Sequence, residues 1–133
     1  MSQEFTVGQS AHFSKTVTET DVVLFAGISG DLNPAHINEI EASQGMFKKR
    51  TAHGMLGASF ISTVLGMYLP GPGTIYLGQQ LTFLKPVSIG DTLTATATIT
   101  SIDDKGWLTL DTVVCNQEGK TVISGQAQVI PPK

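Results

Sequence analysis

The chain has 133 residues, of which 41% are hydrophobic and 14% are charged, and this composition predicts one soluble globular domain rather than two. The formal net charge of −3 argues against nucleic-acid binding, which requires a basic surface. The longest uncharged run, residues 54–84, is interrupted by prolines and glycines, so no membrane-spanning helix is predicted.

The N-terminal residues lack the basic and hydrophobic segments of a signal peptide, and we expect a cytoplasmic protein. The single cysteine, Cys115, cannot form an internal disulfide, and no metal-ligand spacing of Cys and His is present. Residues 5–17 alternate loosely between apolar and polar and predict a first strand or an extended arm. Thr18 to Asp21 are typical of a capping box, which predicts a helix that ends near Gly30.

The residues from Phe25 to His36 hold the most informative pattern in the chain. Pro34 has no N–H and keeps Asn33 out of the helical region, so no single helix runs through this segment. We therefore expect a turn that can direct the side chains of Asp31 and His36 into one pocket. A carboxylate and an imidazole that reach one water form a general acid–base pair. On local chemistry alone, turn and N-cap roles for Asp31 and Asn33 are the more common interpretation.

The rest of the chain predicts a buried helix followed by a sheet. After a short helix at residues 38–46 and a polar connection at 47–51, residues 54–69 carry no charged side chain. A helix that is apolar on every side is buried on every side, so we expect other elements to surround it. Four strands joined by short hairpins are predicted to form an antiparallel meander, at residues 74–87, 91–100, 107–116 and 121–130. Together these elements predict the α+β class.

Residues of mixed chemistry stand at fixed spacing through the turn and beyond it: Phe25, Ile28, Ser29, Gly30, Asp31, Asn33, Pro34, His36 and Ala42. This motif resembles the signature of the MaoC-like (R)-specific enoyl-CoA hydratases, and the resemblance extends over nearly the whole chain. It implies a single domain, residues 1–133, with the hot-dog fold, in which an antiparallel sheet wraps around a long central helix. It also implies a homodimer that acts on acyl-CoA thioesters without a cofactor or metal.

The resemblance implies addition of water to trans-2-enoyl-CoA to give (R)-3-hydroxyacyl-CoA, with Asp31 and His36 holding the water. Negative charge then gathers on the thioester oxygen and requires N–H donors. Gly54 opens the uncharged helix, where the backbone N–H has no helical partner. The family's oxyanion donor matches this position, although a glycine that only fits between helix and sheet is the alternative. The resemblance also suggests that Ser62 lines the site and that Leu65 closes the acyl pocket. A buried serine bonded back to its own helix is the alternative for Ser62.

Three other functions are less consistent with the sequence. A thioesterase or an acyl-carrier dehydratase of this fold usually has an acid on the central helix, and residues 54–69 contain neither Asp nor Glu. A non-catalytic acyl-binding module needs no pair of Asp31 and His36. His53 is assigned to capping or packing, and Lys48 to Arg50 to a solvated loop that could alternatively meet ligand phosphates.

Overall fold

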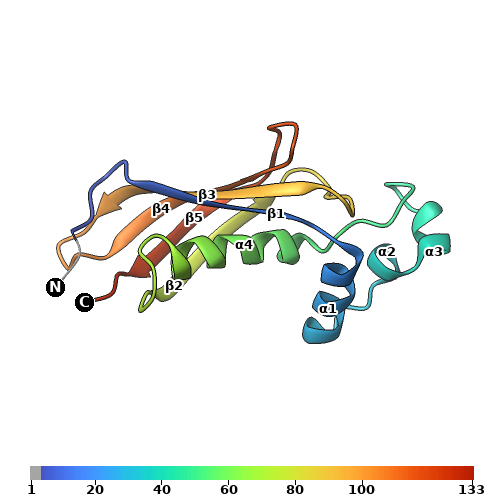
Figure 1. Ribbon diagram of the computed structural model, residues 1–133, viewed down its shortest axis with the longest axis horizontal. Helices are drawn as coiled ribbons and strands as arrows, with labels where there is room; N and C mark the ends of the chain where they lie inside the picture. Colours follow the sequence, from blue (N-terminus) through green and yellow to red (C-terminus); the bar gives the residue numbers. More distant parts are fainter. Residues whose placement is uncertain (1–3) are drawn as a thin grey trace.

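The computed structural model describes residues 4–133, in which five strands form one antiparallel sheet. The elements in chain order are β1 (Ser10–Thr16), α1 (Glu19–Ser29), α2 (Pro34–Ile37), α3 (Glu39–Ser43), α4 (Gly54–Met67), β2 (Ile75–Phe83), β3 (Thr92–Ile102), β4 (Leu108–Cys115) and β5 (Thr121–Ile130). Helix α4 runs along one face of the sheet, and α1, α2 and α3 gather beyond the end at which α4 begins (Figure 1). The predicted α+β arrangement is confirmed.

The core lies between α4 and the sheet face that it covers. Strand β3 has the regular alternation that the sequence indicates, with the side chains at 93, 95, 97 and 99 at most 1% exposed. On the other face, hydroxyls pair across the β1–β3 ladder, for example Ser14 with Thr94 at 2.7 Å. From α4, Ile61, Val64 and Leu65 enter the same apolar cluster. Apolar burial on one face therefore fixes both the strand register and the position of the helix.

The predicted four-stranded meander is wrong in one respect. The strand order is β1-β3-β4-β5-β2, so only β3, β4 and β5 form a meander, and β2 lies beside β5 rather than β3. Strand β1 occupies the outer edge of β3, which leaves β5 as the partner for β2. At this ladder Gly125 lets the strands approach closely, because a Cβ there would lie 1.8 Å from the carbonyl oxygen of Gln80. Strand β2 also ends at Phe83, before Pro86, and does not continue to Val87 as predicted.

The prediction that the uncharged helix is buried on every side is also wrong within this chain. Leu56, Ile61 and Leu65 are buried, whereas Met55 and Met67 are 56% and 62% exposed. The chain has a single sheet in the part that the structure describes, and that sheet covers only one side of α4. The opposite side of the helix therefore remains open. None of the helices in residues 4–133 has the length and hydropathy needed to cross a membrane.

The predicted capping box and turn are confirmed. Thr18 caps α1 with Asp21 as its reciprocal partner, and Gly30 ends the helix in the left-handed region at φ +80°. Helix α2 then begins at Pro34, with Asn33 as its N-cap. The chain therefore reverses between two helices, and both Asp31 and His36 lie near the start of α4.

Candidate active site

The Asp31 side chain projects from a turn that is held by short hydrogen bonds. The backbone N–H of Asp31 donates to the Ser29 hydroxyl oxygen at 3.1 Å, and that hydroxyl donates to the carbonyl of Phe25 at 2.7 Å. One carboxylate oxygen, Oδ1, accepts from the N–H of Asn33 at 3.2 Å. Asp31 thus has the turn role that local chemistry indicates. Its other oxygen has no partner among residues 4–133, and the side chain is exposed.

His36 is held in one orientation and one tautomer. Its Nδ1 lies 2.7 Å from the carbonyl oxygen of Thr51, which can only accept, so Nδ1 carries the proton. The lone pair of the neutral ring is then on Nε2, the atom available to take a proton. Arg50 supports the same helix by donating from Nε to the His36 carbonyl at 2.7 Å and from its guanidinium to Glu19 at 2.8 Å. The Arg50 side chain is 13% exposed and forms an ion pair with the exposed Glu19, so the expectation of a solvated loop fails at this residue.

The fold brings Asp31, His36 and His53 together. One carboxylate oxygen and one nitrogen from each ring lie within 4.8 Å of one another. The three residues line a cavity of about 540 Å³ with Gly54 and with a largely apolar wall. A water between the carboxylate and the imidazole of this site could exchange protons with both.

Carboxylate and imidazole side chains grouped as these three are can bind a metal ion. The linear spacing of Cys and His in the sequence did not indicate such a site. The fold, rather than sequence spacing, assembles them. Two of the four ring nitrogens face backbone carbonyls, because Nδ1 of His36 lies against Thr51 and Nε2 of His53 lies against Asp31. Only the remaining nitrogens could act as ligands.

Gly54 lies at the first position of α4, in the same cavity as Asp31 and His36. Within residues 4–133 its N–H has no hydrogen-bond acceptor, as expected for the first turn of a helix. The ring of Phe83 covers the glycine from β2, since an added Cβ would lie 2.8 Å from two ring carbons. The site therefore offers a free backbone donor beside a close aromatic wall.

His53 precedes Gly54 and occupies the N-cap position of α4, but its side chain makes no capping hydrogen bond. The capping half of the expectation is therefore wrong, and the packing half is confirmed. The ring turns instead toward Asp31, and Nε2–H donates to the Asp31 carbonyl at 2.9 Å. It also stacks on the His36 ring with 3.9 Å between centroids, and Phe25 lies 5.0 Å away.

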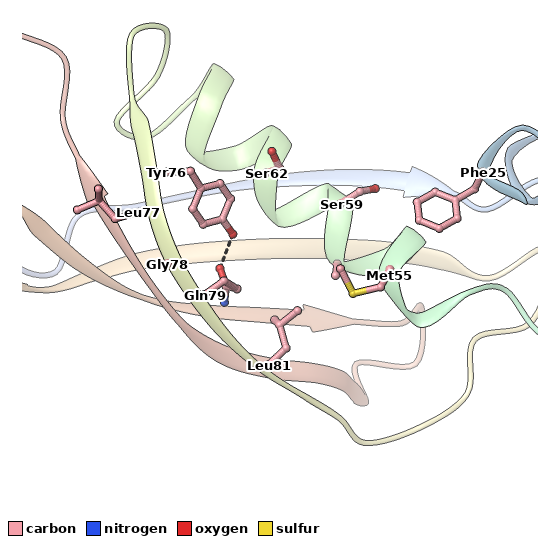
Figure 2. Close-up of a pocket in the computed structure, with 10 residues that line it drawn as sticks. Phe25, Met55, Ser59, Ser62, Tyr76, Leu77, Gly78, Gln79 and Leu81 are labelled. Carbon is pink, nitrogen blue, oxygen red and sulfur yellow. Dashed lines mark hydrogen bonds between the residues drawn. The ribbon is translucent and has the colours of Figure 1, made fainter. Parts of the chain in front are cut away.

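Ser62 and Leu65 lie outside this cavity. Ser62 lines a neighbouring groove of about 530 Å³ between α4 and β2, with Phe25, Ser59 and Tyr76 among its walls (Figure 2). Met55 lines both the groove and the cavity, so the two adjoin at the start of α4. Ser62 is exposed rather than buried, and Leu65 is 1% exposed and lies in the core.

Tyr76 is one of several polar residues in the largely apolar groove, with Ser59, Ser62 and Gln79. Its hydroxyl donates to the side-chain oxygen of Gln79, as Figure 2 shows. Burial of the ring raises the pKa of Tyr76 above its ordinary value of 10.0. The hydroxyl is therefore neutral at physiological pH.

Sequence reasoning missed three contributors to the cavity. The Thr51 carbonyl fixes the His36 tautomer, Phe83 covers Gly54, and His53 contacts both Asp31 and His36. A contact between a backbone carbonyl and a ring that is distant in the sequence cannot be predicted from residue types, because every residue has a carbonyl. Only His53 carries a signal, because it is a histidine directly before the glycine that opens α4.

Comparisons with known proteins bear on the family and the fold of the chain. The model of the MaoC like domain matches residues 3–122. The (R)-specific enoyl-CoA hydratase of Rhodospirillum rubrum is 55% identical, over 94% of this chain and 87% of that protein. The protein of the same name from Aeromonas caviae is 42% identical over 98% of each. The solved structure of R-hydratase PhaJ1 from Pseudomonas aeruginosa, unliganded, has a TM-score of 0.94 at 43% identity, covering 98% of this chain and 84% of that one.

Proposed function

Because the chain belongs to the MaoC-like domain family, we infer that it is an (R)-specific enoyl-CoA hydratase with the hot-dog fold. It adds water to trans-2-enoyl-CoA to give (R)-3-hydroxyacyl-CoA, and the reaction is reversible. One observation carries the assignment to a site: Asp31, His36 and Gly54 line one cavity, and the Gly54 N–H has no acceptor among residues 4–133.

We assign the acid–base work to Asp31 and His36. A water held between them gives one proton to Nε2 of His36 as its oxygen forms a bond to C3 of the enoyl group. The Asp31 carboxylate accepts the remaining hydrogen of that water as a hydrogen bond and stabilises the imidazolium. The electron pair of the double bond moves toward the thioester, and C2 then takes the proton from Nε2 of His36 on the same face, which restores the imidazole. Such a pair contributes about 10²–10⁴-fold to the rate.

Gly54 is proposed to stabilise the thioester oxygen. During water addition this oxygen gains negative charge, and this role for Gly54 is supported by the positive end of the α4 dipole and by an N–H that has no acceptor among residues 4–133. A glycine allows the oxygen to approach the backbone closely. The contact of Phe83 with this position supports a narrow carbonyl site.

We propose that the acyl chain leaves the cavity past Met55 toward the groove that Ser62 lines. The groove is apolar in character, and its wall from β2 includes Leu77 and Leu81. Ser62 contacts the chain near the thioester in this proposal. Leu65 contributes indirectly, because it belongs to the core against which the floor of the groove packs.

We propose that the protein is a single-domain homodimer whose sheets join at β2. Strand β2 is an edge strand, and unpaired edges require protection. Its side chains Ile75, Leu77 and Phe83 are 55%, 47% and 50% exposed. A partner beside β2 would also cover the open side of α4. We also propose that the protein is a cytoplasmic enzyme of fatty-acid metabolism, and the free Cys115 is consistent with the cytoplasmic location.

The function is tested by following loss of the enoyl-thioester absorbance with crotonyl-, hexenoyl- and octenoyl-CoA in turn, with chiral analysis of each product. The proposal predicts hydration of at least one substrate to the (R)-3-hydroxyacyl-CoA. Release of free coenzyme A without hydration would favour a thioesterase instead. Absence of any reaction, with binding retained, would favour the acyl-binding module.

A further inference from the structure

We propose that His53 is a positioning residue for the reaction, which holds the Asp31 main chain so that the carboxylate faces His36. The proposal rests on the function assigned above. It concerns a side chain that the mechanism itself does not use, since His53 neither takes the proton nor receives the thioester oxygen.

The contact to Asp31 is the first observation. His53 is 2% exposed, and its Nε2–H donates to the Asp31 carbonyl at 2.9 Å. Among residues 4–133 no other group donates to that carbonyl. His36, by contrast, has its own anchor at Thr51. Loss of the His53 donor would therefore remove the one hydrogen bond that the described residues make to the Asp31 carbonyl, while the Thr51 carbonyl still holds the His36 ring.

The second observation is that Nδ1 of His53 is buried and has no hydrogen-bond partner among the residues that the structure describes. Buried polar atoms without a partner are rare in folded proteins. The contact of Nε2 with the Asp31 carbonyl is therefore the one hydrogen bond of the His53 ring among residues 4–133. The His53 ring stacks 3.9 Å from the ring of His36, which must gain positive charge during turnover. The His53 ring therefore contacts both members of the proposed acid–base pair.

Two substitutions at His53 separate the donor from the ring, and a third substitution is their control. His53→Phe keeps an aromatic ring against His36 and removes the donor. His53→Gln removes the ring and can place an amide N–H at the position of Nε2. His12→Phe makes the same change at an exposed histidine on β1 and is the matched control. The assay is crotonyl-CoA hydration, with thermal unfolding measured on every variant.

The proposal predicts that His53→Phe lowers kcat by about 10–100-fold with KM nearly unchanged, because displacement of a catalytic group by about 1 Å has effects of this size. His53→Gln should recover kcat to within about fivefold of the unmodified protein, since it restores the donor. In an Asp31→Asn background, His53→Phe should change kcat by less than about twofold, because its effect acts through the Asp31 carboxylate.

Unchanged kcat in His53→Phe, equal loss in His53→Phe and His53→Gln, or the same loss in the Asp31→Asn background would overturn the proposal. If His53→Phe does not fold, His53→Met takes its place with the same expected result. If both variants fail to fold while His53→Gln folds, the hydrogen bond to Asp31 serves stability rather than positioning. That outcome would also overturn the proposal. An unmodified protein without hydratase activity would instead overturn the proposed function.

Discussion

An oxygen of the Asp31 carboxylate lies within 4.8 Å of a ring nitrogen of His36, although Pro34 separates the two residues into a turn and a one-turn helix. The turn gives each side chain a separate anchor, Ser29 for the Asp31 backbone and Thr51 for the His36 ring. Because the anchors are separate, each partner can be altered without displacing the other. This makes the acid–base assignment open to single substitutions.

Replacement of His36 should separate its anchor from its chemistry. His36→Asn can retain an N–H donor toward the Thr51 carbonyl but has no group at the position of Nε2. His36→Gln can place an amide group at the position of Nε2 but has no donor toward the Thr51 carbonyl. Both variants should lose about 10²–10⁴-fold in kcat, because neither amide accepts a proton near neutral pH. Steady-state kinetics on both folded variants test this, and near-native turnover of either would contradict the base assigned to Nε2.

Gly54→Ala keeps the backbone N–H, but its methyl would crowd the thioester oxygen away from that donor, so kcat should fall by about 10²–10³-fold, as on loss of one oxyanion donor. Helix propensity alone predicts that the alanine stabilises by about 0.5–1 kcal/mol. The structure corrects this expectation, because the new methyl would lie 2.8 Å from the Phe83 ring, which must move. Phe83 is 50% exposed, so the ring has solvent to move into.

Phe83→Ala provides the background that separates crowding from chemistry. In the double variant the clash is absent, so stability should recover while activity stays low. Comparison of kcat and melting temperature for both single variants and the double variant tests this. Full activity in Gly54→Ala/Phe83→Ala would show that the glycine serves packing alone.

The sequence predicted the local features of this site better than its long-range contacts. The cap at Thr18, the break at Pro34 and the strand alternation depend on neighbouring residues, so periodicity and turn chemistry were sufficient. Strand β2 lies beside β5 because β1 pairs with the free edge of β3, and no local sequence pattern determines which strand pairs there. The His53 contacts join residues 22 positions apart through a backbone carbonyl, which any residue supplies. Ser62 and Leu65 face different surroundings because the sheet covers one side of α4 only.

Two glycine substitutions should change the stability in opposite directions, one where β2 approaches β5 and the other on helix α1. Gly125→Ala should destabilise by about 1–3 kcal/mol or more, because its Cβ would lie 1.8 Å from the Gln80 carbonyl oxygen and a strand must shift. Gly27→Ala, on an exposed face of α1 with no atom within 4 Å of the new methyl, should stabilise by about 0.5–1 kcal/mol. Urea unfolding of both variants measures the difference. A stable Gly125→Ala would argue against the β2–β5 register.

The proposed dimer predicts a solution mass of twice 14.1 kDa by light scattering at micromolar concentration. Leu77→Lys places a charge on the exposed edge strand β2 and should shift the mass toward 14.1 kDa. Val7→Lys, at a residue that is 63% exposed before β1, is the control and should leave the mass unchanged. A monomeric unmodified protein would rule out the dimer, and a dimeric Leu77→Lys would move the interface away from β2.

Asp21 predicts an acid-sensitive contribution to stability. A hydrogen bond from the Lys15 ammonium, and the capping bonds with Thr18, hold the pKa of Asp21 below its ordinary value of 3.8. The ionised carboxylate therefore stabilises the folded chain above pH 3.8, and this contribution disappears as the pH falls through the lowered native pKa. Asp21→Asn keeps the capping oxygen and loses the charge. Its deficit in unfolding free energy should be present at pH 7 and should vanish in acid, and a deficit independent of pH would contradict the ion pair.

The central claim is that the Asp31 carboxylate does chemistry in addition to holding its turn. Asn caps and turns about as well as Asp, so Asp31→Asn should leave the fold and the melting temperature almost unchanged. The decisive measurement is kcat of this variant for hydration of crotonyl-CoA. We predict a loss of about 10²–10⁴-fold in a fully folded protein. Near-native turnover in the folded variant would show that Asp31 is a turn residue only and would contradict the acid–base pair.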